Sequence, residues 1–209
     1  MKLLLTGFEP FNGQTVNPSE QIVHRLTSPA GTTLIKAVLP VEFQKAAAHL
    51  QELIKIHQPD ILLSIGQAGG RPEITVERVA INIDSVKSSD GSKLLPDNAG
   101  DIPVDEPIAT NGPAAYFATL PLWEIVKVIQ EKGIPASVSN TAGTYVCNHI
   151  MYLGLHEAAR YPKMKSGFIH VPFLPEQIAH REDRDRLAAM SLENMVTALQ
   201  AALEVLATL

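Results

Sequence analysis

Three side chains of this sequence could together carry out covalent acyl transfer. Cys147 is the only cysteine, His170 ends an apolar run, and Glu77 stands in a stretch of alternating apolar and polar residues. A thiol nucleophile, an imidazole base and an orienting carboxylate are the parts of a cysteine acyl-transfer enzyme. The three residues belong to separate predicted elements, so this hypothesis requires the fold to bring them together.

Cys147 lies where a predicted strand, 134–139, turns into a helix that is regular from Asn148 to about Tyr161. A thiol on the first turn of a helix lies among unpaired backbone N–H groups and at the positive end of the helix dipole. Both favour the thiolate, which is the nucleophilic form. A lone cysteine is also commonly a small buried apolar residue, and position alone does not decide between the two interpretations.

His170 is the best-placed histidine for a base. It ends the predicted strand 166–171, and Pro172 and Pro175 then direct the chain out of the sheet. His149 is adjacent to Cys147 in sequence, but residues two apart on a helix point to different faces, which makes it a poor base for that thiol. The remaining histidines lie on predicted helices or polar flanks and are expected at the surface: His24, His49, His57, His156 and His180.

Glu77 is an unusual residue for its position. The stretch 73–83 alternates as a strand does, and this pattern puts Glu77 on the same face as Val79 and Ile81. A carboxylate on an apolar face needs a partner. Either the strand register differs from this pattern, or the acid is held there for a purpose.

The elements that must position these residues alternate between strand and helix. Apolar runs predict strands over 2–5, 32–39 and 61–65, and helical periodicity predicts helices over 17–26, 42–57, 121–132 and 191–209. This order predicts an α/β fold, a three-layer α/β/α sandwich with a mostly parallel central sheet, in one domain spanning 1–209. The irregular stretch 84–113 is long enough to serve as a lid, a binding loop or a subunit contact.

Two loops follow predicted strands at the end of the sheet where ligands bind in such folds. The first carries Phe8 and Phe11, which could wall a small apolar pocket or simply close the core. The second, Gly66 to Arg71, resembles a phosphate-binding loop, but it lacks the Lys-Ser/Thr pair of a P-loop and the spacing of a dinucleotide motif.

Composition excludes several classes of function. The chain has 209 residues, 45% hydrophobic and 19% charged, and a formal net charge of -5, so no nucleic-acid partner is expected. No apolar run approaches the roughly 18 residues of a membrane span, and no signal peptide is apparent. No Cys/His cluster has metal-ligand spacing, and neither a metal nor another cofactor is expected. One cysteine excludes an intrachain disulfide and is typical of a cytoplasmic protein.

Several long motifs resemble those of the pyrrolidone-carboxylate peptidases, also called pyroglutamyl-peptidases I. Gly66 to Arg71 and then Ile74 to Asn82 are similar to the glutamate signature of that family, and Val138-Ser139 with Thr141 to His149 are similar to its cysteine signature. Three shorter segments are similar to its histidine segment and N-terminal motif: Gly167 to Pro172, Leu5 to Phe11, and Val16 to Ser19. Together they reach from the first strand to about Gln177.

The resemblance implies a cysteine peptidase that removes an N-terminal pyroglutamyl residue from peptides, without a cofactor and as a homotetramer. It implies Cys147 as nucleophile, His170 as general base and then acid, and Glu77 as the residue that orients His170. The substrate ring would lie in an apolar pocket with few polar contacts. The residues expected to bind it are Phe8, Phe11, Gly66, Gln67, Leu95 and Val146.

One stretch departs from the family pattern. Many members have a shorter link before Pro-Asp-Asn, with an Arg-Ile pair, where this chain has Leu94-Leu95 after a longer insertion from Ser85. Three alternatives remain open: a different cysteine-dependent amide or lactam hydrolase, an enzyme related to nucleoside phosphorylases, whose fold the family resembles, and a binding protein without turnover.

Overall fold

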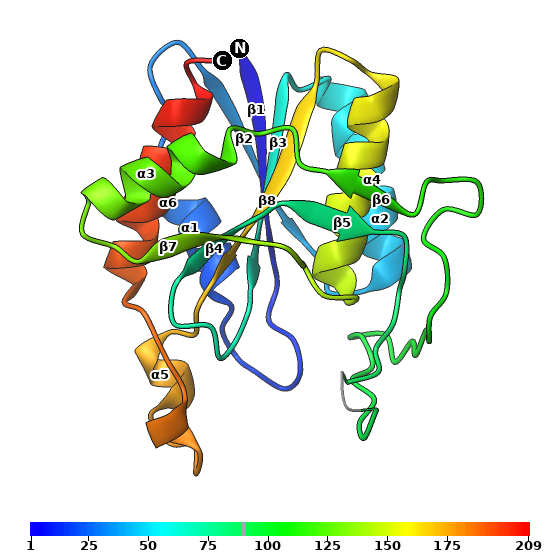
Figure 1. The fold of residues 1–209 in the computed structure, drawn as a ribbon, viewed down its shortest axis with the longest axis vertical. Coiled ribbons are helices and arrows are strands. Elements are labelled where there is room, and N and C mark those ends of the chain that lie inside the picture. The colour runs from blue at the N-terminus through cyan, green and yellow to red at the C-terminus, as the bar shows by residue number, and fades with distance from the viewer. Residues whose placement is uncertain (89–90) are drawn as a thin grey trace.

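A six-stranded sheet, in the order β2-β1-β3-β8-β4-β7, forms the middle layer of the molecule (Figure 1). The structure is a computed structural model, and it describes residues 1–88 and 91–209. The strands are β1 (Lys2–Phe8), β2 (Thr33–Leu39), β3 (Ile61–Gln67), β4 (Ile74–Glu77), β7 (Ala136–Ser139) and β8 (Lys165–Val171). All neighbouring pairs are parallel except β4 and β8, which confirms the expected mostly parallel sheet.

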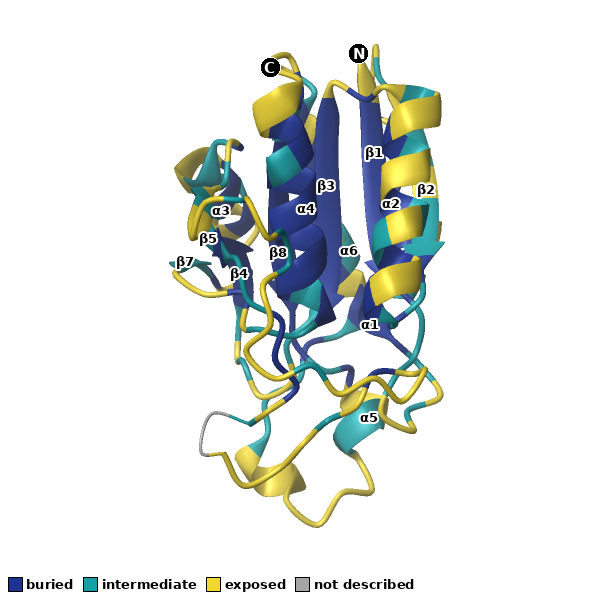
Figure 2. Cartoon of the chain, turned by 90° about the vertical axis from the view of Figure 1, so that its right-hand side faces the viewer, coloured by how far each residue is buried: buried dark blue, intermediate teal, exposed yellow. Residues whose placement is uncertain are grey.

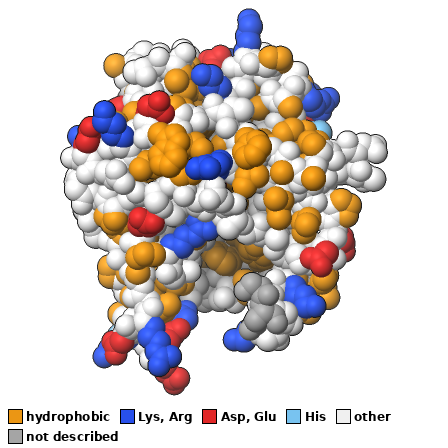
Figure 3. Space-filling model, viewed as in Figure 1, with side chains coloured by type: hydrophobic (Ala, Val, Ile, Leu, Met, Phe, Trp, Pro, Cys, Tyr) orange, Lys and Arg blue, Asp and Glu red, His pale blue; other side chains and the backbone are white. Residues whose placement is uncertain are grey.

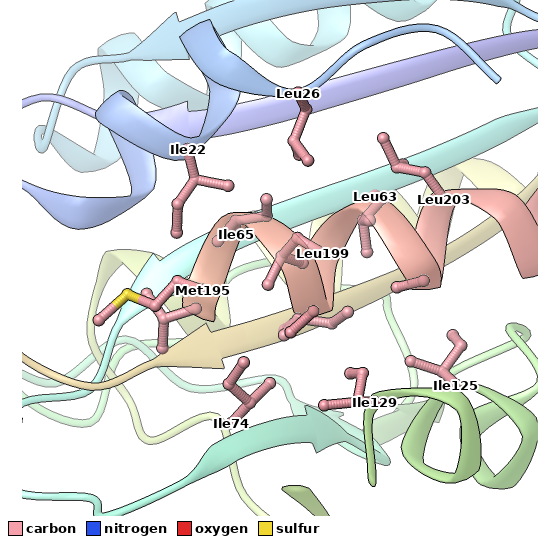
Figure 4. Close-up of a cluster of buried hydrophobic side chains, with 14 of the residues drawn as sticks. Ile22, Leu26, Leu63, Ile65, Ile74, Ile125, Ile129, Met195, Leu199 and Leu203 are labelled. Carbon is pink, nitrogen blue, oxygen red and sulfur yellow. The ribbon is translucent and has the colours of Figure 1, made fainter. Parts of the chain in front are cut away.

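Helices cover both faces of this sheet and confirm the three-layer architecture. They are α1 (Pro18–Arg25), α2 (Phe43–His57), α3 (Leu122–Glu131), α4 (Val146–Arg160), the single turn α5 (Pro175–Ile178), and α6 (Leu192–Leu206). The helices α1, α3 and α6 pack on one face, where Leu63 and Ile65 of β3 meet Leu199 and Leu203 of α6 (Figure 4). The helices α2 and α4 cover the other face: α2 exposes its outer side, whereas α4 is buried along most of its length, as are most of the strands (Figure 2).

Local sequence signals account for several helix ends. Asn17 caps α1 by accepting a hydrogen bond from the Ser19 N–H, and Pro18 occupies the first turn. The Ser191 hydroxyl accepts from the Asn194 N–H at the start of α6. The helix that carries Cys147 begins at Val146, so Cys147 is its second residue.

The stretch 73–83 is not one strand, which corrects the expectation for Glu77. It divides at Arg78 into β4 and β5 (Val79–Ile81), and β5 pairs with β6 (Ala115–Phe117) in a separate two-stranded sheet. The Arg78 N–H donates to Ser139 O, and its carbonyl accepts from the Ala118 N–H, so the backbone changes partners at this residue. The prediction that Glu77 shares a face with Val79 and Ile81 was therefore wrong, because Glu77 belongs to the central sheet alone.

The loops that follow β1, β3 and β8 gather at one end of the sheet, opposite the two chain termini (Figure 1). The space-filling view shows a hollow at this end, between the α5 segment and the long loop after β5, with apolar side chains at its back (Figure 3). In open α/β sheets this is the end where ligands bind. Within the described part of the chain, no helix is long and apolar enough to cross a membrane.

Candidate active site

A buried imidazole–carboxylate pair joins β8 to β4. The strands pair so that Thr75 lies opposite His170 and Glu77 lies opposite Phe168. The Nδ1 atom of His170 is 2.8 Å from Oε1 of Glu77, with His170 3% exposed and Glu77 fully buried. Because a carboxylate can only accept, Nδ1 carries the proton and donates it, which leaves Nε2 as the basic nitrogen.

Burial and neighbouring charges together determine the protonation states of Glu77 and His170. Arg71, after the β3 loop, donates through Nη1 to Oε1 of Glu77, and the Thr75 hydroxyl donates to the same oxygen at 3.3 Å. Burial alone would raise the pKa of Glu77, but His170, Ser139 and Arg71 together hold that pKa below its usual value. Burial also lowers the pKa of His170; Glu77 opposes this shift and Arg71 adds to it. The pair is therefore a carboxylate and a neutral imidazole at neutral pH.

Cys147 lies over β3 on the same face of the sheet as His170. Gly66 is the β3 residue directly paired with His170. A Cβ at Gly66 would lie 2.8 Å from Cys147 Sγ and 2.8 Å from the Phe168 ring, so only glycine leaves room for the sulfur here. The sulfur thus rests on the strand position next to the imidazole.

The thiol is not the low-pKa group that its helix position predicts. Burial, with a smaller contribution from the Glu77 carboxylate and against the opposing effect of Arg71, raises the pKa of Cys147 to about 12. The protein therefore holds a neutral thiol at neutral pH, and a base must take its proton as it attacks. The first turn of α4 nevertheless has no side-chain cap on its N–H groups, so these donors stay available to an anion.

A small, largely apolar pocket opens beside Cys147, at the end of the sheet where β1 and β3 finish. Tyr145, the residue before α4, faces Phe11 at a ring-centroid distance of 6.2 Å and Phe43 at 5.5 Å. Its hydroxyl donates to Pro96 O on the long loop at 3.0 Å, which joins that loop to the pocket wall. The lining residues are Phe8, Phe11, Asn17, Val41, Gln67, Tyr145, Val146 and Cys147.

Of the residues expected to bind substrate, four line this pocket: Phe8, Phe11, Gln67 and Val146. Gly66 is not in the lining, but its lack of a side chain leaves room for the Cys147 sulfur. Leu95 lies apart from the lining, half-buried on the long loop, where its N–H donates to Val86 O. It belongs to the stretch that departs from the family pattern, and residues 89 and 90 of that stretch lie outside the described part of the chain.

A second buried imidazole–carboxylate pair lies on the far side of the helix start. His149 Nδ1 is 2.7 Å from Oδ2 of Asp84, with both residues less than a tenth exposed. The His149 ring packs edge-on against Phe43 and is not part of the pocket lining. The expectation that His149 does not serve the thiol agrees with this placement.

Sequence reasoning missed four residues of the site. Asn17, Val41 and Tyr145 line the pocket, and Arg71 is the cation beside Glu77. Asn17 had been assigned only as the start of a helix, and Val41 lies just after a strand. Arg71 could have been found from its place after a Gly-Gly turn, six residues before the buried acid. Among the described residues, no group of three or more His, Cys, Asp or Glu side chains could hold a metal ion.

Comparison with known proteins gives one consistent answer. The model of the pyroglutamyl peptidase family matches residues 1–208. A pyrrolidone-carboxylate peptidase of Levilactobacillus brevis is 47% identical over 205 residues, which is 97% of this chain and 96% of that protein. One from Streptococcus pyogenes is 46% identical over 97% of this chain and 91% of its own length.

Solved structures agree. Pyroglutamyl peptidase I of Bacillus amyloliquefaciens superposes with a TM-score of 0.91 at 44% identity, over 100% of this chain and 97% of that one. A mutant pyrrolidone carboxyl peptidase of Pyrococcus furiosus gives 0.92 at 43% identity, over the whole of both chains. With the motifs, the fold and the full-length matches in agreement, this chain belongs to the pyroglutamyl peptidase family.

Proposed function

We propose that this protein hydrolyses the amide bond after an N-terminal pyroglutamyl residue, with Cys147 as nucleophile, His170 as general base and acid, and Glu77 as the residue that orients His170. One observation carries the assignment of roles. The Glu77–His170 pair, 2.8 Å apart, is directly beside Gly66, and the sulfur of Cys147 rests on Gly66. No other cysteine exists in the chain, so no other thiol could serve.

Acylation follows from the protonation states. Sγ attacks the pyroglutamyl carbonyl carbon while Nε2 of His170 takes the thiol proton, because a thiol with a pKa of about 12 does not ionise alone at neutral pH. The imidazolium that forms is stabilised by the Glu77 carboxylate at Nδ1. It then gives its proton to the departing amine, and a thioester remains on Cys147.

Deacylation repeats these steps with water. His170 takes a proton from the attacking water, and collapse of the tetrahedral intermediate returns the thiol and releases pyroglutamate. The N–H groups at the start of α4, that of Cys147 among them, have no side-chain cap and would hold the oxyanion. Fixed dipoles of this kind stabilise the developing charge without reorganisation.

The pocket beside Cys147 suits an uncharged five-membered lactam. Phe8 and Phe11 offer apolar surface to the ring, and the backbone at Gln67 and Val146, which also line the pocket, would bond its polar edge. An ordinary N-terminal residue would bring an ammonium group into this mostly apolar space. Such a group would lose its hydration without finding an anionic partner in the lining.

The assay is the release of a chromogenic amine from a pyroglutamyl amide. We expect turnover of this substrate and not of the matching prolyl or glutamyl amide. Iodoacetamide should abolish the activity, and Cys147→Ser should reduce kcat at least about 10³-fold. Equal turnover of the prolyl amide would refute the substrate assignment, and full activity of Cys147→Ser would refute the mechanism.

We also propose that the chain forms a homotetramer in the cytoplasm. Phe117 of β6 and Trp123 of α3 are 71% and 64% exposed, and the Arg78 guanidinium lies 5.7 Å from the Trp123 ring centroid. Large exposed aromatic side chains of this kind favour a subunit contact. Light scattering should give the tetramer mass for the wild type and a lower mass for Phe117→Glu; a wild-type monomer would contradict the assembly.

An active-site thiol without a disulfide partner suits a reducing compartment such as the cytoplasm, which cell fractionation would test.

A further inference from the structure

The guanidinium of Arg71 makes three hydrogen bonds beside the proposed catalytic residues. Through Nη1 it donates to Thr75 Oγ1 and to Glu77 Oε1, which both lie on β4. Through Nη2 it donates to Thr141 O at 3.0 Å, in the loop between β7 and α4. Its side chain is 28% exposed and that of Glu77 is fully buried, so this is not a freely hydrated surface ion pair. A planar fork of two nitrogens therefore bridges the strand of the acid and the loop that leads to the nucleophile.

The hydrogen bonds of Glu77 converge on one of its two oxygens. Oε1 accepts from the Nδ1 atom of His170 at 2.8 Å, from Arg71, and from the Thr75 hydroxyl at 3.3 Å. Within the described part of the chain, the buried Oε2 atom has no hydrogen-bond partner. The position of Oε1, and with it the orientation of the imidazole, thus depends on the other donors that hold this oxygen.

The bond to Thr141 O anchors the fork on the side away from the acid. Arg71 follows β3, and its own N–H donates to Ala68 O at 3.3 Å across the turn after that strand. With the backbone closed in this turn and Nη2 held by the loop carbonyl, Nη1 is kept at Glu77. An ammonium has a single nitrogen, so Arg71→Lys keeps the positive charge but cannot bond Glu77 and Thr141 O through separate nitrogens.

We infer that Arg71 is a positioning residue for the catalytic base. Its fork, anchored on Thr141 O, holds Glu77 at Nδ1 of His170 and keeps the imidazole in the orientation from which Nε2 takes the thiol proton. This inference rests on the proposed function, since it takes His170 as the base. It goes beyond the effect of the Arg71 charge, because it depends on the shape of the guanidinium. Neither Arg71 nor Glu77 lines the pocket, so loss of the fork should slow the chemistry and leave substrate binding unchanged.

The variant Arg71→Lys separates the fork from the charge. We expect kcat for a pyroglutamyl amide to fall about tenfold to a hundredfold, as for a small misplacement of a catalytic group. The rate of Cys147 alkylation by iodoacetamide should fall by a similar factor, because the neutral thiol needs the same base in that reaction. KM should match the wild type because the pocket is unchanged, and the acid limb of kcat/KM should keep its position because the positive charge remains.

Chemical rescue of Arg71→Ala is the second test. Added guanidinium ion should restore part of kcat and of the alkylation rate, whereas methylammonium, which brings the charge without the fork, should not. Arg25→Lys is the matched control, because Arg25 also pairs with a glutamate, Glu193 at 3.2 Å, but at the exposed surface. It should match the wild type.

Wild-type kcat and alkylation rate in Arg71→Lys would overturn the inference, and so would equal rescue of Arg71→Ala by the two cations. A fall in kcat together with a rise in KM of the same size would also overturn it, since the fork would then act on binding. Failure of the proposed function looks different. The wild type itself would not turn over the pyroglutamyl amide, while the alkylation rates would still test the fork.

Discussion

Two buried imidazole–carboxylate pairs flank the start of α4, and they differ in what surrounds them. His170 and Glu77 are 2.8 Å apart; His149 and Asp84 are 2.7 Å apart. Within the part of the chain that the structure describes, only the first pair contacts a cation, Arg71, and only the first lies beside the strand position that supports Cys147. The second is covered by Phe43 and leaves His149 Nε2 buried, with no partner among the described residues. A short contact between a histidine and an acid therefore does not by itself indicate a catalytic role. The nearby cation and thiol are what distinguish the first pair from the second.

The largest expected difference comes from neutralising each carboxylate in turn. Glu77→Gln can keep an amide oxygen where His170, Arg71 and Thr75 donate, but it removes the negative charge that stabilises the imidazolium formed when His170 takes the thiol proton. We expect kcat to fall about 10²- to 10⁴-fold. Asp84→Asn makes the same chemical change at His149, and its kcat should stay within about tenfold of the wild type. Steady-state kinetics on a pyroglutamyl amide measures both, and equal losses in the two variants would refute the distinction.

The second prediction concerns the stability contributed by the His149–Asp84 pair. His149→Leu leaves the Asp84 carboxylate buried without its partner, which should reduce the free energy of unfolding by roughly 1–3 kcal/mol. Adding Asp84→Asn to this variant removes the unpaired buried carboxylate and should restore part of the lost free energy of unfolding. Urea denaturation of the single and double variants measures this. A single variant as stable as the wild type would show that the pair is not structural.

The smallest effect is a shift in the pH profile. Arg71 lowers the pKa of His170, and the base works only when the imidazole is neutral, so activity is lost as the pH falls through that pKa. Arg71→Met removes the positive charge, and the acid limb of kcat/KM should then move to higher pH. No movement, or a movement to lower pH, would show that Arg71 does not act on His170 electrostatically.

Much of the fold was predictable because its strands are continuous apolar runs and its helices have one apolar face. The Cys147, His170 and Glu77 candidates followed from their residue types and from strand ends. The break at Arg78 was not predictable, because the alternation continues through it while the backbone changes partners from Ser139 to Ala118.

The electrostatics also required the structure. The helix position of Cys147 predicts a lowered pKa, but burial, which local sequence does not reveal, raises it to about 12. Gln177 has no periodic neighbours on its single turn, and its contacts reach residues 110 and 161 positions away.

The most direct test is to trap the covalent intermediate. A pyroglutamyl amide mixed with excess enzyme and quenched in acid within one turnover should leave a pyroglutamyl thioester, visible as added mass on the intact chain. Peptide mapping should place it on Cys147, and Cys147→Ser should show none. Turnover by the wild type with no adduct at any time point, or with the adduct on another residue, would contradict the account.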